Sequence, residues 1–345
     1  MKTAIFRDDL FLEHMKDFNH VESASRLQVI YQELDRPEIA RQFVFPSFTA
    51  VGPEILKLNH SAAYIKQVAA TAGQPFVSLD PDTQTSARSY DAACLAVGAA
   101  VSATRMVVAG EVDNAFCLVR PPGHHAEADR AMGFCLFNNV AVAAHFAIQE
   151  LGLERVMIVD WDLHHGNGTQ HSFYDTDKVL YFSTHQYPYY PGTGDFKESG
   201  RGNGLGCTVN VPLPAGLDDR AFATIYNDLL APIARQYKPE LIILSAGYDI
   251  HQNDPLGGMM VSETGFAYMT KVLMDLAAGC GNRFLVCLEG GYDLNGLKNG
   301  IMATLSEMRG QSIMADKTVM ELTTISMPLM ALEQTRSVAK KVWNL

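Results

Sequence analysis

The chain has 345 residues, of which 48% are hydrophobic and 19% are charged, so it is long enough to bury a sizeable core. Its 27 lysine and arginine residues are outnumbered by 38 aspartate and glutamate residues, which gives a net charge of −11 at pH 7. This balance argues against a broad surface for nucleic acid or for an anionic membrane. We therefore expect one domain over residues 1–345, with no nucleic-acid partner and no membrane partner.

The beginning of the chain, its apolar stretches and its cysteines indicate the cellular compartment and the residue types available to bind a metal. Arg7, Asp8 and Asp9 lie where a secretion signal would need apolar residues, and no later stretch reaches the run of about 18 apolar residues that a membrane span needs. We therefore expect a cytoplasmic protein. The six cysteines, at positions 94, 117, 135, 207, 280 and 287, form no C-x-x-C pair and are expected to be buried free thiols. Any metal would then be held by histidine and aspartate.

Short apolar runs alternate along the chain with longer segments of helical periodicity, which predicts an α/β fold with a mostly parallel sheet. Strands are predicted at residues 3–7, 114–119, 155–160, 179–183, 206–211, 241–246 and 284–289. Helices are predicted at residues 86–109, 137–151, 218–236, 262–279 and 294–308, with Asp218 and Ser262 as caps. For the segment after about residue 310, packing on the core and an oligomer contact both remain open.

Five of the predicted strands run directly into polar, glycine-rich or aromatic segments. These segments are RPPGHHAEADRAMGF, WDLHHGNG, HQYPYYPGTG, GYDIHQNDP and GGYD, in chain order. Ligands of parallel sheets bind at the carboxyl ends of the strands, where the loops converge on one crevice. The placement therefore predicts a single site built from distant segments.

Asp162 and His164 are two residues apart directly after a strand, so both side chains can reach one ion from the same face. Asp249, after another strand, is the third candidate ligand. One imidazole and two carboxylates suit a catalytic Zn²⁺ with an open position for water, although Fe²⁺ or Co²⁺ could use the same ligands. A D-x-H triplet alone is more often an ordinary turn. The density of ionisable groups from Asp160 to His165, at the end of an apolar strand, favours a metal site.

The tandem histidines His124 and His125 follow a rigid segment, Arg120-Pro-Pro-Gly. Such a pair alone more often satisfies buried carbonyl groups, but a metal loop in the same crevice favours acid–base chemistry. Asp160 and Asn167 are candidates to orient the two imidazoles, and an aspartate would favour the charged form more than an asparagine. The hydroxyl of Tyr292, in the segment EGGYD, could donate to a developing oxyanion, although a simple packed tyrosine is the alternative.

Taken together, the segments RPPGHHA, MGFCLFNN, DWDLHHGNGTQ, SAGYD and LEGGYD resemble the histone deacetylase-like amidohydrolases, which include the acetylpolyamine amidohydrolases. The resemblance implies the single-domain arginase–deacetylase α/β fold and one Zn²⁺ at Asp162, His164 and Asp249. It also implies that His125 is the general base and then acid, that His124 gives electrostatic help, and that Tyr292 polarises the acyl carbonyl. Asp160 and Asn167 match the family's positions behind the two histidines, and an asparagine there is similar to the class II branch.

The same resemblance implies further binding residues. Phe134 and Tyr190 match the aromatic walls of the acyl-lysine channel, and Gly133 and Gly291, beside Phe134 and Tyr292, are also expected to contact substrate. A structural K⁺ or Na⁺ is implied at groups that match Asp160, Asp162, His164, Ser183 and Thr184. A second monovalent site is implied at groups that match Phe173, Thr176 and Val179.

The predicted function is removal of an acyl group, most simply acetyl, from lysine side chains in a peptide or protein. Leu256 occupies the place where a polyamine-selective relative would carry an acid, and Asp80 or Asp82 could grip the substrate backbone at the rim. The alternatives are an acetylpolyamine deacetylase, a ureohydrolase with two manganese ions, and a non-enzymatic acyl-lysine binder. The ureohydrolase needs extra carboxylates, whereas His165 follows His164 and the next acid after Asp249 is Asp254. A homo-oligomer is also compatible with the sequence.

Overall fold

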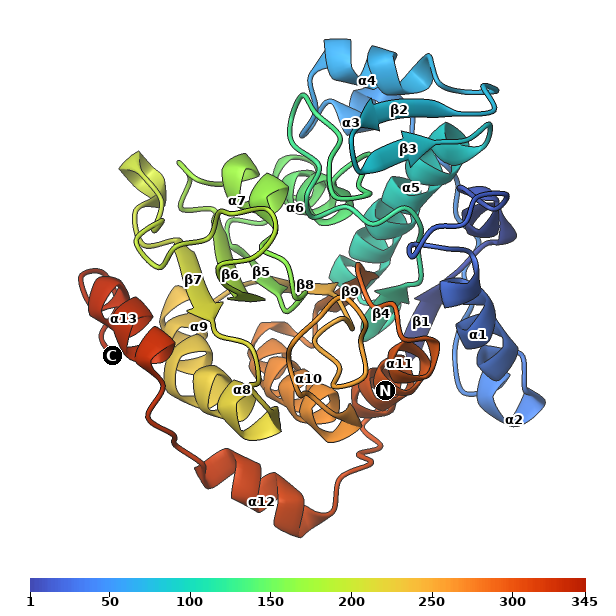
Figure 1. Ribbon diagram of the computed structural model, residues 1–345. Coiled ribbons are helices and arrows are strands. Elements are labelled where there is room, and N and C mark those ends of the chain that lie inside the picture. Colours follow the sequence, from blue (N-terminus) through green and yellow to red (C-terminus); the bar gives the residue numbers. More distant parts are fainter.

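The computed structural model describes residues 1–345 and contains a central sheet of seven parallel strands (Figure 1). Their spatial order is β1-β4-β9-β8-β5-β6-β7. The strands are β1 (Thr3–Phe6), β4 (Asn114–Cys117), β5 (Val156–Asp160), β6 (Val179–Gln186), β7 (Thr208–Leu213), β8 (Leu241–Ala246) and β9 (Phe284–Leu288). All seven match predicted strands, so the predicted α/β class with a parallel sheet is confirmed.

The central strands are apolar runs because helices cover the sheet on both faces. Every residue of β4, β5, β8 and β9 is buried. In Figure 1, α5 (Ser89–Val108) and α6 (Asn139–Gln149) lie above the sheet, while α8 (Asp219–Ile225), α9 (Ala231–Tyr237), α10 (Glu263–Ala277) and α11 (Leu294–Met308) lie below it. A strand that is covered on both faces gains from burying all of its side chains, which explains the absence of polar alternation.

The five predicted helices are present, with one difference. Asp218 and Ser262 cap α8 and α10 as predicted, since their side chains accept main-chain N–H groups of the first turn. The predicted helix over 218–236 is interrupted by a π-helical segment, Tyr226–Leu230, between α8 and α9. Pro232 lies in the first turn of α9 and has no N–H to continue the hydrogen-bond ladder, so the ladder widens just before it.

Several shorter elements were not predicted. They are η1 (Asp9–Glu13), α1 (Ser25–Leu34), α2 (Pro37–Ala40), α3 (Pro53–Leu56), α4 (Ala62–Ala69), the antiparallel hairpin of β2 (Val77–Asp80) and β3 (Thr83–Thr85), α7 (Asn167–Ser172), η2 (Gly202–Gly204), η4 (Ala278–Cys280), α12 (Asp316–Thr324) and α13 (Met330–Ala339). The end of the chain packs on the edge strand β7. The hydroxyl of Thr335 donates to the carbonyl of Asn210 at 2.8 Å, and Trp343 donates to the carbonyl of Gly206 at 2.9 Å.

The long helix α5 is apolar enough, by length and composition, to pass for a membrane span, yet 72% of its most apolar window is buried inside the fold. It is therefore the core helix that packs on β4 and β9. All six cysteines are free, as predicted, and five of them are buried, whereas Cys280 is only partly buried.

Gly98 lets α5 approach the segment before α3. A Cβ atom at this position would lie 2.1 Å from the carbonyl oxygen of Thr49, which is main chain and cannot rotate away. Alanine favours a helix over glycine by about 1 kcal/mol, but here the clash should outweigh that gain. We expect Gly98→Ala to lower the melting temperature by several degrees, as measured by circular dichroism. Gly279→Ala, where a Cβ meets nothing within 4 Å, is the control. Equal effects of the two substitutions would contradict the packing argument.

Candidate active site

Four adjacent strands of the sheet, β4, β9, β8 and β5, carry the candidate site at their carboxyl ends. Asp162 and His164 follow β5, and Asp249 follows β8. One ligating atom from each of the three residues lies within 4.8 Å of the others. The Nδ1 atom of His164 lies 3.2 Å from Oδ1 of Asp162 and 3.3 Å from Oδ2 of Asp249. The structure therefore brings the three predicted metal ligands together around one point.

The surroundings of these ligands fit a small cation. Oδ2 of Asp162 accepts the N–H of Gly290 at 2.9 Å, and Oδ1 of Asp249 accepts the N–H of Leu163 at 2.9 Å. Oδ2 of Asp249 is buried without a hydrogen-bond donor. A Cβ atom on Gly290 would meet both carboxylates, at 2.4 and 2.7 Å, so only glycine leaves room beside them. Main-chain donors orient the carboxylates, and an unpaired oxygen remains for an ion.

Without a cation, the ligands compensate one another's charge. Burial and the charge of Asp162 raise the pKa of Asp249 to about 7. Burial opposes protonation of His164, but its hydrogen bond to Asp162 and the nearby carboxylate of Asp249 raise its pKa to about 9. A divalent cation bound here would replace the proton of His164 as the partner of both carboxylates.

His125 has its Nδ1 atom 2.8 Å from Oδ1 of Asn167. The Asn167 amide nitrogen donates to the carboxylate of Glu127, so its oxygen faces the imidazole. His125 therefore donates through Nδ1, which leaves Nε2 as the basic nitrogen. Burial, followed by repulsion from His124 and His164, holds the pKa of His125 well below its usual range. The low pKa favours a neutral ring, and the amide partner opposes this less than a carboxylate would.

His124 has a different environment. Its Nδ1 atom lies 3.1 Å from Oδ2 of Asp160, and its Nε2 atom lies 3.8 Å from Oδ1 of Asp162. Burial disfavours the charged imidazole, but the charges of Asp162 and Asp160 outweigh burial and raise the pKa to about 10. Two adjacent histidines thus differ in protonation because one faces carboxylates and the other faces an amide.

The segment that carries Tyr292 is fixed by buried charges that the sequence did not reveal. Arg26 donates to the carbonyls of Glu289 and Gly291 at 2.5 and 2.7 Å, and its guanidinium lies 5.1 Å from the centre of the Tyr292 ring. Glu22 accepts from both Arg26 and Arg120, at 2.9 and 2.6 Å. This ion-pair network links the loop of the two histidines to the loop of Tyr292.

The carboxylate of Glu289 is a second link between these loops. It accepts the N–H groups of Gly123 and His124 at 2.7 and 3.2 Å, and the hydroxyl of Ser245 at 2.9 Å. Burial raises the pKa of Glu289 to about 7. Burial also raises the pKa of Tyr292 well above its usual range, so its phenol stays protonated and can donate a hydrogen bond.

A narrow cavity of about 90 Å³ leads to the candidate metal ligands Asp162 and His164. Its lining comprises Asp82, Pro122, His124, His125, Gly133, Phe134, Asp162, His164, Tyr190, Leu256, Gly290 and Tyr292. Four residues predicted to bind substrate, Phe134, Tyr190, Gly133 and Leu256, therefore line this cavity, and their contact with substrate stays a prediction. Gly133 has a positive φ of 57°, and a Cβ there would lie 2.2 Å from the His125 ring. The main chain at this position can therefore pack against the His125 ring only because the residue is glycine.

Two predicted substrate contacts do not line the cavity. Asp82 lines the cavity and Asp80 does not, because Asp82 lies in the turn of the β2–β3 hairpin and its carboxylate accepts the N–H of Gly133 at 2.9 Å. Gly290 replaces Gly291, whose carbonyl is turned towards Arg26.

The residues predicted to bind monovalent cations are neighbours in space. Asp160 and Ser183 are register partners on β5 and β6, and the adjacent hydroxyl of Thr184 is buried without a partner. Asp162 and His164 belong to the loop that follows β5. For the second group, the N–H of Thr176 donates to the carbonyl of Phe173 at 3.4 Å, and Val179 begins β6. Binding of K⁺ or Na⁺ at either place stays a prediction.

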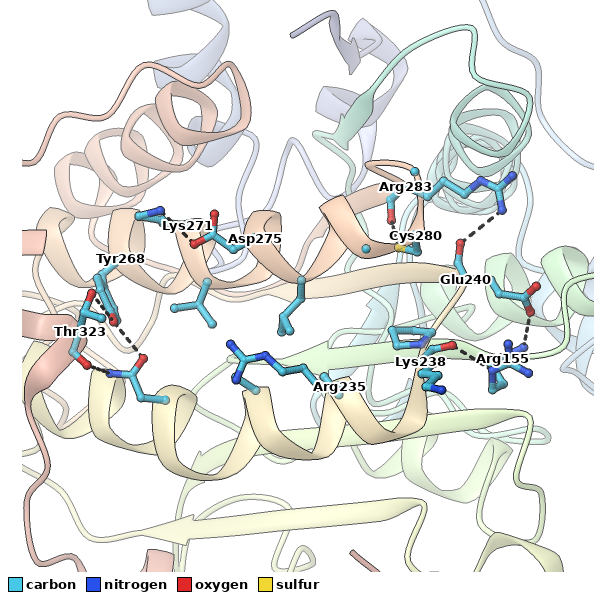
Figure 2. Close-up of a pocket in the computed structure, with 18 of the residues that line it drawn as sticks. Arg155, Arg235, Lys238, Glu240, Tyr268, Lys271, Asp275, Cys280, Arg283 and Thr323 are labelled. Atoms are coloured by element: carbon cyan, nitrogen blue, oxygen red, sulfur yellow. Dashed lines mark hydrogen bonds and ion pairs between the residues drawn. The ribbon is translucent and has the colours of Figure 1, made fainter. Parts of the chain in front are cut away.

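A wider furrow of about 960 Å³ lies between α9 and α10. Figure 2 shows Arg235 and Lys271 along it, with Arg155, Glu240 and Arg283 at one end. These last three residues immediately precede β5, β8 and β9. That end of the furrow is therefore at the amino ends of the strands, the edge opposite to the candidate metal ligands.

Comparisons with known proteins agree with this geometry. A family model for the histone deacetylase domain matches residues 20–308. The chain is 38% identical over 317 residues to histone deacetylase 5 of Arabidopsis thaliana, covering 87% of this chain and 47% of that protein. It is 36% identical over 300 residues to a probable deacetylase of Archaeoglobus fulgidus, covering 86% and 83%.

A crystal structure of the HDA15 HD domain superimposes with a TM-score of 0.90 at 34% identity, covering 99% of this chain and 95% of that one. The chain spans about half the length of the plant histone deacetylases 5 and 18. The fold is therefore the predicted arginase–deacetylase fold, and the chain belongs to the histone deacetylase family.

Proposed function

We propose that this chain is a zinc-dependent hydrolase that removes acetyl groups from lysine side chains of peptides or proteins. The observation that carries the proposal is the convergence of Asp162, His164 and Asp249 at the base of a narrow cavity that His125 and Tyr292 also line. A cavity of about 90 Å³ suits a short acyl group on a thin alkyl chain. Family membership supports amide hydrolysis as the reaction class.

Zn²⁺, held by Asp162, His164 and Asp249, would polarise the acyl carbonyl and lower the pKa of water towards about 7. Iron(II) is the alternative ion for the same donor set. The protein supplies the remaining chemistry through groups with separate tasks.

His125 takes a proton from the attacking water as the new C–O bond forms. It then gives that proton to the amine nitrogen as the C–N bond breaks, so the products are acetate and a free lysine. The hydroxyl of Tyr292 donates to the carbonyl oxygen as that oxygen gains negative charge. His124, charged through Asp160, stabilises the negative charge in the transition state.

His165 and Asp254, which follow the candidate ligands in the sequence, are both engaged in other contacts, which argues against a second metal ion of the ureohydrolase type. Both ring nitrogens of His165 are engaged, with Thr193 at 2.7 Å and Gln170 at 3.0 Å. The carboxylate of Asp254 accepts three main-chain N–H groups. We therefore favour a single metal ion. The presence of base, charge partner and oxyanion donor together favours an enzyme over a passive binder of acyl-lysine.

Substrate choice rests on the mouth of the cavity. Leu256 is apolar and would lie along the alkyl chain of lysine, which favours a peptide or protein substrate. Asp82 at the same mouth could attract a second ammonium group, so an acetylated polyamine is the alternative. The kcat/KM of the zinc-loaded protein should be compared on an acetyl-lysine peptide, a longer acyl-lysine peptide and an acetylated polyamine. We expect the highest value for the acetyl-lysine peptide. A higher value for the polyamine would favour the alternative, and no turnover of any substrate would indicate a binder.

Tyr292→Phe removes the proposed oxyanion donor and keeps the ring. We expect kcat to fall on the order of 10²–10³-fold, as for loss of one oxyanion-hole donor, with the bound zinc retained. Steady-state kinetics with metal analysis would check this. Tyr268→Phe, in the furrow between α9 and α10 (Figure 2) and outside the cavity that Tyr292 lines, is the matched control and should leave kcat unchanged. Unaltered turnover of Tyr292→Phe would remove this residue from the mechanism.

Asn167→Asp should raise the pKa of His125, because a carboxylate beside Nδ1 stabilises the imidazolium that burial now disfavours. His125 acts as a base only when it is neutral, so the acidic limb of the pH–rate profile should move to higher pH. Since Asn167 also bonds Glu127, the substitution should be repeated with Glu127→Gln, which removes the competing carboxylate. A limb that stays in place in both backgrounds would show that Asn167 does not set the protonation of His125.

A further inference from the structure

Asp254 lies in the loop after β8 and is 7% exposed, although no reaction step above uses it. One of its carboxylate oxygens, Oδ2, accepts the N–H of Tyr292 at 2.6 Å and the N–H of Asp293 at 3.2 Å. These two N–H groups are consecutive in the main chain, and the Cα and carbonyl carbon of Tyr292 lie between them. A buried carboxylate with two neighbouring N–H donors fixes the local direction of that chain.

The other oxygen of Asp254 binds the main chain of a residue that lines the cavity. Oδ1 accepts the N–H of Leu256 at 2.9 Å, and Leu256 lines the cavity. The carbonyl of Leu256 in turn accepts the hydroxyl of Tyr189 at 2.8 Å. The ring of Tyr189 stacks on the metal ligand His164, with 5.6 Å between ring centres. One carboxylate thus connects the oxyanion donor, the cavity mouth and the metal ligand.

Asp254 has no other evident task. Its oxygens are occupied by main-chain donors, so it is not available to ligate a metal ion. Arg26 binds the loop that carries Tyr292 through main-chain carbonyl groups, those of Glu289 and Gly291. The main-chain N–H groups of this loop have carboxylate acceptors. Asp254 accepts those of Tyr292 and Asp293, and Asp162 accepts that of Gly290. Without Asp254, the main chain at Tyr292 would lose both of its donor-side contacts.

We propose that Asp254 is a positioning residue that holds Tyr292 over the reacting carbonyl and keeps Leu256 at a fixed distance from it. The inference rests on the proposed hydrolase function and adds to it the residue that places the oxyanion donor. A misplacement of about 1 Å costs on the order of 10² in rate when the group acts only in the transition state. Asp254 should therefore affect kcat through Tyr292, with little effect on KM.

The test is a double-mutant cycle on the zinc-loaded full chain with an acetyl-lysine peptide. We expect Asp254→Ala to lower kcat on the order of 10- to 100-fold and to change KM by less than about threefold. In the Tyr292→Phe background, the same substitution should cost less than about threefold, because the group that it positions is already gone. Asp254→Asn, which keeps the size and one acceptor oxygen, should give a smaller loss and carries the same test if the alanine variant does not fold.

The matched control is Glu240→Ala, at the opposite edge of the sheet (Figure 2). Glu240 also accepts two main-chain N–H groups, those of Glu154 and Arg155, at 2.7 and 2.9 Å. Its loss should leave kcat unchanged in both backgrounds. This control separates the position of Asp254 from the general effect of removing a carboxylate that binds main-chain donors.

A second measurement does not depend on turnover. Amide hydrogen exchange in the segment 289–293 should become faster in the Asp254 variants than in the unsubstituted protein, because two amides lose their acceptor. An equal loss of kcat with and without Tyr292, or unchanged exchange in this segment, would overturn the positioning role. An unsubstituted protein that does not hydrolyse acetyl-lysine would refute the proposed function instead, and the exchange result would still decide whether Asp254 holds the loop.

Discussion

The structure depends on balancing the negative charges of several buried carboxyl groups at one edge of the sheet. Asp160, Asp162, Asp249 and Glu289 are at most 1% exposed and come from adjacent strand ends. An ionised carboxylate without partners would be very costly there. The chain supplies main-chain N–H groups, histidines and one place for a cation, and the differing partners give neighbouring groups different protonation states.

The topology explains how distant segments share this edge. The chain forms β5, β6 and β7 outward from the middle of the sheet and later returns to insert β8 and β9 between β4 and β5. The loops after β4, β5, β8 and β9 therefore become neighbours. Buried side chains then join these loops, with Glu289 binding the histidine loop and Glu22 pairing with Arg26 and Arg120. The site is positioned by long-range polar contacts on a rigid parallel sheet.

Local patterns in the sequence predicted the strands, the long helices and the residues that cluster at the strand ends. They predicted that the candidate metal ligands lie together and that His124 and His125 have polar partners behind them, because those residues lie in short motifs. They did not predict Glu22, Arg26 or Glu289 as links, since Glu22 and Arg120 are 98 residues apart and a buried ion pair has no local pattern. Asp82 was not separated from Asp80 because both flank one turn, and only the docking of that turn on Gly133 decides which side chain faces the cavity.

The central claim is that one metal ion, held by Asp162, His164 and Asp249, is required for hydrolysis of acetyl-lysine. The most direct measurement is the turnover of an acetyl-lysine peptide by chelator-treated protein during stepwise addition of Zn²⁺. Our account predicts that turnover rises from near zero to a plateau at one equivalent of zinc per chain, and that Asp249→Ala stays inactive over the same range. Full turnover without metal, or a plateau only at two equivalents, would contradict it.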